Sequence, residues 1–339
     1  MNNNMKNNLD KSTSADRDNE LLKNSFVSVR DSVSKSLEII NYTMRNNDNI
    51  SGVSTGLADL DNKLSGFQDS NLIILAGRPS MGKTAFAANF AFNACQDLVK
   101  KAKNGEKQQS VGFFSLERSS TQLASGLLSM MARVNSTYLG NGRVHKENYD
   151  DLQKAANDLA EMPLFIDDTA SLTIDELRIR ARRLKEEENV GIIFVDYLQL
   201  LRTSDKQNYR TLEITEIIRE LKVIAKDLNI PVVVLSQLSR DLEKRKDKRP
   251  RLSDLSDSAA IEQVADVIML LYREEYYLKR QEPALGDRRY SEWQEQLDRA
   301  HNIAEIIVAK HRNGSIGNIY LRYIDKFSSI ENWERMHVN

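Results

Sequence analysis

The sequence predicts an α/β fold in which a mostly parallel β-sheet is flanked by helices. From about Ile50 onwards, short apolar runs alternate with longer helical patterns, as in parallel strands covered by helices on both faces. Hydrophobic residues make up 40% of the 339 residues, which is enough for a sizeable core. We therefore expect residues 50–339 to form the main domain.

Composition excludes several classes of protein. The 48 Lys+Arg nearly balance the 49 Asp+Glu, which excludes a globally basic chromatin-type protein but permits a local basic patch. The single cysteine, Cys95, excludes a disulfide scaffold and a cysteine-built zinc site. No apolar run approaches the roughly 18 residues of a membrane helix, and the polar N-terminus lacks the apolar core of a secretory signal. The sequence thus indicates a soluble, cytoplasmic protein with no membrane partner.

Residues 1–49 divide into a tail, a helix and a loop. Residues 1–19 have the polar composition of a disordered tail, and Asn46-Asn47-Asp48-Asn49 is typical of a loop. Over residues 20–45 an amphipathic helix is predicted by apolar residues at steps of three and four: Leu22, Phe26, Val29, Val33, Leu37, Ile40 and Met44. Burying such a stripe offsets the entropy of ordering only if the helix docks. The partner is either its own domain or a neighbouring subunit.

The elements of the main domain follow from their apolar patterns. We expect strands at Leu72–Ala76, Val111–Ser115, Leu164–Ile166, Gly191–Val195, Pro231–Leu235, Val267–Tyr272, Ala304–Ala309 and Ile319–Tyr323. Helical patterns cover Thr84–Lys101, Ser119–Arg133, Lys146–Glu161, Ile174–Glu188 and Leu212–Asn229. Thr173 and Glu176 form a capping box at the start of the fourth helix. The last strands follow one another closely, so we expect the edge that they form to be antiparallel.

A phosphate-binding loop is predicted by eight consecutive residues, Gly77-Arg78-Pro79-Ser80-Met81-Gly82-Lys83-Thr84. An apolar strand precedes them and a helix follows, so backbone N–H groups and the helix N-terminus can face an anion. Gly82 allows close approach of the backbone, Lys83 can reach the β- and γ-phosphates, and the Thr84 hydroxyl can bind Mg²⁺. The alternative is a chance Gly-rich turn. We expect ATP with Mg²⁺ at this loop.

Three further residues are expected at the same edge of the sheet. Asp196 ends an apolar strand, as a Walker B aspartate does, and is expected beside Thr84 and the metal. Glu117 follows the strand Val111–Ser115 and is the candidate base that polarises water. Gln237 ends another strand and can sense the γ-phosphate. The structural alternatives are a turn cap for Asp196, a helix N-terminal charge for Glu117 and a satisfied strand-end amide for Gln237.

Eight segments follow one another in an informative order: GVSTGLADLD, LIILAGRPSMGKTAFA, FFSLE, FVDYLQLL, VVVLSQLSR, KRPRLSDL, IEQVADVIMLLYR and AKHRNG. Together they resemble the C-terminal motor domain of DnaB-type replicative DNA helicases, from about Ile50 to Tyr323. The resemblance implies a RecA-like P-loop NTPase fold. It also implies hexameric rings that bind ATP between subunits and translocate 5′ to 3′ on single-stranded DNA.

The resemblance also implies roles for single residues. Lys83 and Thr84 match the phosphate-loop pair, Glu117 the catalytic carboxylate, Asp196 the Walker B aspartate and Gln237 the γ-phosphate sensor. Lys310 and Arg312 match a basic pair that the family inserts into the neighbouring subunit's ATP site. A trans arginine of this kind contributes about 10³–10⁵ in rate.

For the regions around this core, the resemblance implies two partners. The helix over residues 20–45 is similar to the family's linker helix, which favours docking on the adjacent subunit. Single-stranded DNA is the expected partner of a basic stretch over residues 239–252 and the loop after it. We assign the candidate DNA contacts to Arg240, Arg249, Arg251, Ser256, Asp257 and Ala259, the last three standing where the family usually has Arg, Glu and Gly. A mobile solvated loop is the alternative.

Two functions remain open at this stage. The first is a ring-forming, ATP-hydrolysing 5′–3′ replicative helicase that works with replisome proteins. The second is a paralogue that binds nucleotide and joins or regulates the helicase ring without unwinding. The family's N-terminal collar domain has no counterpart in this sequence, which favours the second, whereas Glu117, Lys310 and Arg312 favour the first. A recombinase-like or clock-type ATPase fits the phosphate loop but not the ordered segments.

Overall fold

The computed structural model describes residues 26–46, 50–204, 209–255, 258–284 and 286–333. The chain divides into two units, Met1–Ser51 and Gly52–Asn339. In the smaller unit, helix α2 spans Val29–Asn46. In the described part of the chain, no helix is both long enough and apolar enough to cross a membrane.

The start of α2 differs from the helix expected over residues 20–45. Residues 26–28 are not helical, because the Ser28 hydroxyl accepts the Asp31 N–H at 3.1 Å and so caps the helix. Residues 1–25, which include the expected tail and Leu22, lie outside the described residues, as does most of the loop after Asn46. Along α2 the apolar stripe is exposed, with about half of the residue accessible at Val33 and Leu37 (51% and 53%).

The larger unit is built on a sheet whose described strands run in the order β3-β2-β4-β5-β1-β6-β7-β8-β9. These strands are β1 Leu72–Gly77, β2 Ser110–Ser115, β3 Leu164–Asp167, β4 Val190–Asp196, β5 Val232–Gln237, β6 Val267–Tyr272, β7 Ile303–His311, β8 Gly317–Ile324 and β9 Ser329–Asn332. Strands β1 to β6 pair in parallel. The pairs from β6 to β9 are antiparallel, which confirms the expected antiparallel edge.

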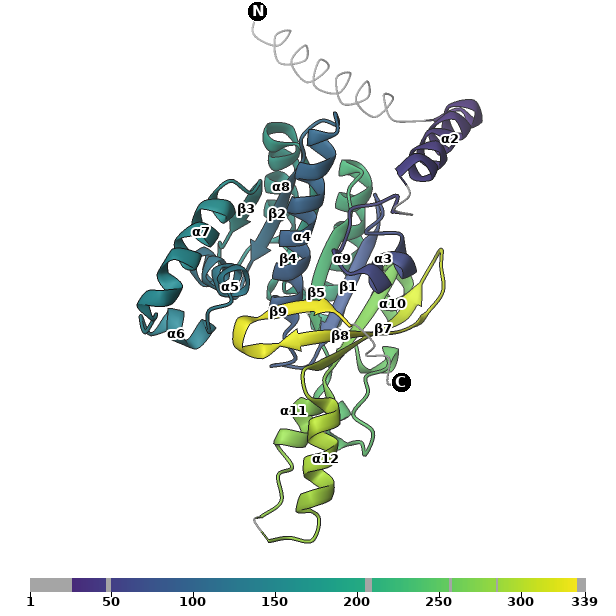
Figure 1. Ribbon diagram of the computed structural model, residues 1–339. Coiled ribbons are helices and arrows are strands. Elements are labelled where there is room, and N and C mark those ends of the chain that lie inside the picture. Colours follow the sequence, from purple (N-terminus) through teal and green to yellow (C-terminus); the bar gives the residue numbers. More distant parts are fainter. Residues whose placement is uncertain (1–25, 47–49, 205–208, 256–257, 285, 334–339) are drawn as a thin grey trace, which may run out of the picture. The chain divides into compact units, whose positions relative to one another are not determined.

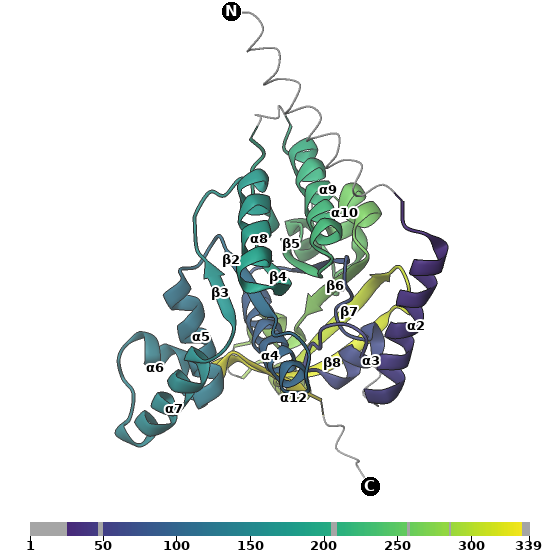
Figure 2. The same ribbon diagram turned by 90° about the horizontal axis from the view of Figure 1, so that it is seen from above.

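Helices cover both faces of this sheet (Figures 1 and 2). The helices described in the larger unit are α3 Ala58–Leu64, α4 Lys83–Lys103, α5 Ser120–Ala132, α6 Ser136–Gly140, α7 Tyr149–Ala160, α8 Ile174–Glu188, α9 Arg210–Leu228, α10 Ser258–Val264, α11 Glu274–Lys279 and α12 Tyr290–Ala300. One core layer joins α4 to side chains such as Ile73, Leu75 and Phe194, and the other joins α8, α9 and α10 to Leu72 and Ile74. Alternate residues of β1 thus enter opposite cores, and this confirms the α/β fold with a mostly parallel, helix-covered sheet.

Local signals set several helix ends. At α8 the Thr173 hydroxyl accepts the Glu176 N–H at 3.3 Å, and the Glu176 carboxylate accepts the Thr173 N–H at 2.9 Å, so the expected capping box is present. Ser119 and Gln122 form an equivalent box before α5. Strand β9 was not expected from the sequence, because it is only four residues long and is held by pairing with β8.

Candidate functional site

The phosphate loop joins the carboxyl end of β1 to the start of α4. Ser80 and Gly82 both have positive φ angles, 66° and 94°, which turn the backbone back over the N-terminus of α4. A Cβ atom at Gly82 would lie 3.1 Å from the Tyr323 hydroxyl, so this position favours glycine on two counts. The loop therefore presents backbone N–H groups and a helix N-terminus at one place, an arrangement that suits a phosphate group.

Lys83 lies folded over this loop. Its Nζ donates to the Gly77 carbonyl at 3.0 Å and to the Arg78 carbonyl at 3.2 Å. Burial lowers the pKa of Lys83 to about 8, against the opposing influence of the nearby Asp196 and Glu117 carboxylates. The ammonium group is therefore held at the mouth of the loop with little water around it.

Thr84 and Asp196 meet across the gap between α4 and β4. The Thr84 hydroxyl donates to Asp196 Oδ2 at 2.7 Å, and Asp196 is almost fully buried. Burial raises the pKa of Asp196, although the Thr84 hydrogen bond acts in the opposite direction. Among the described residues there is no cluster of three or more His, Cys, Asp or Glu side chains that could hold a metal. The hydroxyl–carboxylate pair instead fits Mg²⁺, which keeps several waters and takes few protein ligands.

Glu117 and Gln237 flank this pair on neighbouring strands. In the β2–β4 pairing Ser115 stands opposite Asp196, so Glu117, two residues further on, projects beyond the same edge and is exposed. In the β1–β5 pairing Gln237 stands opposite Gly77, at the beginning of the phosphate loop. The structure thus brings together the carboxylate, amide, lysine and hydroxyl groups that the sequence predicts. Their chemical roles stay predictions.

These residues line one large cleft. It encloses about 1490 Å³, and its wall includes the phosphate loop and the residues around it: Pro79, Ser80, Gly82, Lys83, Thr84, Glu117, Asp196 and Gln237. Gly77, Arg78 and Met81 are not in the wall. Met81 packs into the core. Arg78 turns away, donating to Glu243 Oε1 at 3.0 Å and to the Leu238 carbonyl at 2.9 Å. The side chains of Arg78 and Met81 are therefore directed away from the cleft.

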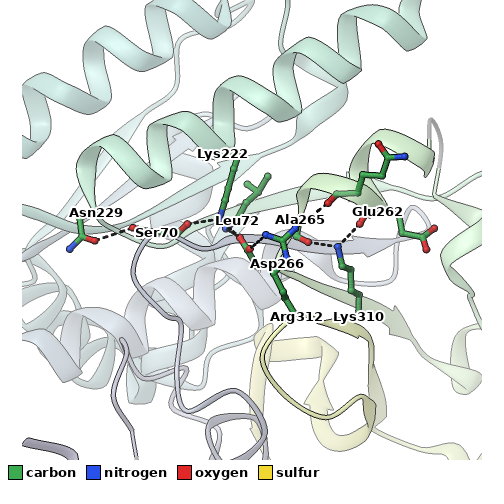
Figure 3. Close-up of polar contacts among 10 residues, drawn as sticks. Ser70, Leu72, Lys222, Asn229, Glu262, Ala265, Asp266, Lys310 and Arg312 are labelled. Carbon is green, nitrogen blue, oxygen red and sulfur yellow. Dashed lines mark hydrogen bonds and ion pairs between the residues drawn. The ribbon is translucent and has the colours of Figure 1, made fainter. Parts of the chain in front are cut away.

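Lys310 and Arg312 lie elsewhere, at the end of β7 (Figure 3). Lys310 donates to the carbonyls of Glu262 and Ala265, and Arg312 donates to Asp266 Oδ1 at 2.9 Å. Because β7 runs antiparallel to β6, its end lies beside the start of the parallel strands. With a rise of about 3.3 Å per residue over the length of β1, Arg312 is roughly 17 Å from the phosphate loop of its own chain.

The candidate DNA contacts do not form one free basic surface. Arg249 donates to the buried Glu305 carboxylate at 3.0 Å, and its guanidinium lies 5.0 Å from the centre of the Tyr272 ring. Arg251 lies 3.6 Å from Asp247, whereas Arg240 and Ala259 are exposed. Ser256 and Asp257 lie outside the described residues. Arg249 therefore has an internal structural role that its charge alone did not reveal.

Sequence reasoning missed several residues around the site. Gln199 accepts the Gln237 N–H at 3.2 Å and donates to the Ser236 hydroxyl at 3.0 Å, so it orients the end of β5. Its position in the segment FVDYLQLL was the available signal. No sequence spacing indicated that Tyr323 lies beside Gly82 or that Glu243 accepts a hydrogen bond from Arg78. Both contacts join distant parts of the chain.

The helix-covered, mostly parallel sheet, with the phosphate loop after β1 and Asp196 at the end of β4, defines a RecA-like P-loop NTPase fold. Residues 52–332 match the family described as DnaB-like helicase C terminal domain. The chain belongs to this family.

Similar proteins agree with that assignment. The chain is 56% identical to a replicative DNA helicase DnaB of Rickettsia conorii over 93% of its length, and 39% identical to one of Geobacillus stearothermophilus over 91%. It spans 64% and 63% of the length of these relatives.

Solved structures are also similar to this chain. One described as an ATPase domain has a TM-score of 0.78 at 32% identity, with 91% of this chain and all of that chain covered. A DnaB-like replicative helicase, described with its primase interactions, has a TM-score of 0.74 at 32% identity, with 91% of this chain and 68% of that chain covered.

Proposed function

We propose that this chain is the motor of a ring-forming replicative DNA helicase, which hydrolyses ATP between subunits and moves 5′ to 3′ along single-stranded DNA. One observation carries the proposal. The cleft gathers residues of the phosphate loop, the hydrogen-bonded pair Thr84 and Asp196, and the candidate base Glu117, yet the basic pair Lys310 and Arg312 lies a strand length away. A second copy of the chain is the natural recipient of that pair.

In this proposal ATP is the substrate of the cleft. The loop from Gly77 to Thr84 binds its phosphates, with Lys83 placed at the β- and γ-phosphates. Thr84 and Asp196 would hold Mg²⁺, which supplies positive charge to the phosphate oxygens. Glu117 orients the attacking water and accepts its proton, and Gln237 contacts the γ-phosphate. The common position of these groups at the strand ends supports the assignment.

The neighbouring subunit supplies the remaining positive charge. Phosphoryl transfer spreads negative charge over the γ-oxygens, and an arginine added in trans is worth about 10³–10⁵ in rate. Arg312 suits this role because its side chain is 47% exposed even while it is paired with Asp266. Lys310 is the second cation of the pair.

Helix α2 is the proposed linker between subunits. Its exposed apolar stripe includes Val29, Val33, Leu37, Ile40 and Met44. Each such side chain contributes about 1.5–3 kcal/mol when fully buried, so docking on an adjacent copy in a homo-hexamer would remove a costly exposed surface. This supports the division of the chain into a linker over residues 20–49 and a motor over residues 50–339.

Single-stranded DNA is the proposed track, bound through its phosphates rather than its bases. The exposed Arg240 and Arg251 are the best placed of the candidate contacts, because their charges reach solvent. Ser256, Asp257 and Ala259 carry no cation and would donate to the phosphates through their backbone N–H groups or, for Ser256, through its hydroxyl. A ring that acts on chromosomal DNA is expected in the cytoplasm, with replisome proteins as its partners.

The proposal is tested by ATP turnover of the wild type, Lys83→Ala and Arg312→Ala, each with and without single-stranded DNA. We expect DNA to stimulate the wild type and both variants to lose turnover, and we expect the wild type to unwind a fork with a 5′ tail. Full turnover by dilute monomers would contradict the shared site. Nucleotide binding and ring entry without unwinding would instead favour the regulatory paralogue, which the internal engagement of Arg249 by Glu305 supports.

A further inference from the structure

Asp266 is a buried carboxylate that joins three elements of the larger unit. It is 4% exposed and stands directly before β6. Its Oδ2 accepts the Leu72 N–H of β1 at 2.8 Å and the Lys222 ammonium of α9 at 2.5 Å. Its Oδ1 accepts Arg312 Nη1 at 2.9 Å, and its backbone carbonyl accepts the Arg312 N–H at 2.9 Å. Figure 3 shows Lys222, Arg312 and the backbone of Leu72 meeting at this one carboxylate.

The two oxygens of Asp266 have different tasks. Oδ2 is bound to the framework, because Lys222 also donates to the Ser70 carbonyl at 2.8 Å, just before β1. Oδ1 faces Arg312. Lys222 therefore keeps the buried carboxylate compensated and in place whether or not the guanidinium stays on it, which a buried charge requires.

The guanidinium of Arg312 is held on one side and open on the other. Nη1 contacts Asp266, and Nη2 donates to the Gln263 carbonyl at 3.2 Å. Nearly half of the side chain remains exposed, so it can meet a further anion without leaving Asp266. An arginine without such an anchor samples many rotamers and loses orientation.

We propose that Asp266 is a positioning residue for hydrolysis in the neighbouring subunit: it holds Arg312 at the angle and reach at which its guanidinium meets the phosphates bound there. This inference rests on the proposed function, in which Arg312 acts across the subunit boundary. Asp266 itself touches no substrate. It acts in trans through Arg312, while Lys222 holds it to the sheet of its own subunit.

The test uses mixtures of full-length variants, since a trans-acting residue and a cis-acting residue behave differently in mixed rings. Asp266→Asn keeps the side-chain shape and can still accept the Leu72 N–H. We expect its rings to lose at least about tenfold in kcat, by analogy with the loss of other groups that fix geometry, with little change in KM for ATP. Mixing them with Lys83→Ala, which has a defective phosphate loop but an intact Arg312, should raise turnover above that of either variant alone.

A parallel mixture of Arg312→Ala with Lys83→Ala separates the two proposals. If both mixtures recover turnover, Asp266 acts in trans. If only the Arg312→Ala mixture recovers, Asp266 serves its own subunit and the inference is overturned while the proposed function stands. If neither recovers, the trans site of the proposed function fails, and the inference fails with it. Wild-type turnover by Asp266→Asn alone would also overturn the inference.

Two further variants distinguish a loss of positioning from a loss of folding. Asp61→Asn neutralises another buried carboxylate, which accepts the Thr55 N–H at 2.8 Å, and should lower stability without lowering turnover. Where Asp266→Asn does not yield folded rings, Asp266→Glu replaces it in the same mixtures. Glutamate keeps the charge but moves the carboxylate by one methylene group, so the same loss of kcat and the same recovery in trans are expected.

Discussion

Arg78 of the phosphate loop donates from Nε to Glu243 Oε1 at 3.0 Å. Glu243 belongs to a short 3-10 helix, Arg240–Lys244, that follows Gln237 at the end of β5. The same guanidinium holds the Leu238 carbonyl at 2.9 Å. The loop that faces the phosphates is thereby tied to the segment that carries the exposed Arg240, a candidate DNA contact. The two proposed binding regions therefore share one ion pair within a single subunit.

Removing the Arg78–Glu243 ion pair should lower the stability of the protein and weaken the stimulation of ATP turnover by DNA. Arg78→Met removes the partner of the Leu238 carbonyl and of Glu243, which should cost about 1–3 kcal/mol of unfolding free energy because buried polar groups lose hydrogen bonds. We also expect DNA to stimulate ATP turnover less than in the wild type. Chemical denaturation and DNA-dependent turnover measure the two effects. Arg183→Met, which removes an exposed ion pair with Glu187 on α8, serves as the control and should change neither.

The lowered pKa of Lys83 predicts that ATP affinity falls as the pH rises through about 8. Only the charged ammonium attracts phosphate, and each pH unit above its pKa removes about nine-tenths of that form. Between pH 7 and pH 9 the dissociation constant of ATP should rise by about tenfold. Fluorescent nucleotide titration measures it, and Lys83→Met should bind weakly with no such midpoint. Equal wild-type affinity at both pH values would contradict the prediction.

The same pKa predicts the sign of a stability change in the nucleotide-free protein. The folded pKa of about 8 lies below the ordinary value of 10.5, so the unfolded chain binds more protons between these values. Buried charge on Lys83 therefore costs stability below about pH 8, and this cost disappears as the pH approaches 10.5. Lys83→Met should remove this part of the pH dependence of the unfolding free energy. If the difference in unfolding free energy between the wild type and Lys83→Met stays constant from about pH 7.5 to about pH 10, the prediction is contradicted.

Asp196→Asn should abolish most ATP turnover while the protein stays folded. The change removes the charge that faces Thr84 and, in the proposed site, the metal. We expect a loss of about 10²-fold or more, as for other preorganised charge-stabilising groups, and a higher Mg²⁺ requirement for the remaining turnover. Turnover is measured against Mg²⁺ concentration. Asp167→Asn is the matched control, because Asp167 ends the nearby strand β3, pairs with Arg180 and does not line the cleft.

The exposed stripe of α2 predicts that assembly is sensitive to one charge on its apolar face. Leu37→Asp should shift the protein from rings to smaller species, since burying an unpaired carboxylate is costly. Lys35→Asp places the same carboxylate on the opposite face of the helix and should leave the mass unchanged. Light scattering in the presence of ATP measures the mass of both. Rings of unaltered mass and stability for Leu37→Asp would exclude this stripe as the linker surface.

The parts of the fold and site that could be predicted from the sequence are those set by residues close together in the chain. The strand Val267–Tyr272 and the helix Ile174–Glu188 were expected with the bounds that the structure has, because an uninterrupted apolar run and a capping box lie within or directly beside each segment. The phosphate loop was equally local. The expected helix over residues 20–45 was wrong at residues 26–28, since the periodic stripe continues upstream of the Ser28 cap at which α2 begins.

The sequence by itself determined the fold class, the order of the strands along the chain, and which groups stand at their carboxyl ends, because apolar runs, caps and turns act over a few neighbouring residues. Only the tertiary structure decided the partners of its charges. Arg312 rests on Asp266, Arg249 on Glu305 and Arg78 on Glu243, each pair separated by dozens of residues or more. Because charges interact through space, the partner of each charged side chain depends on the order and register of the strands. Local patterns of residues do not determine that order or register.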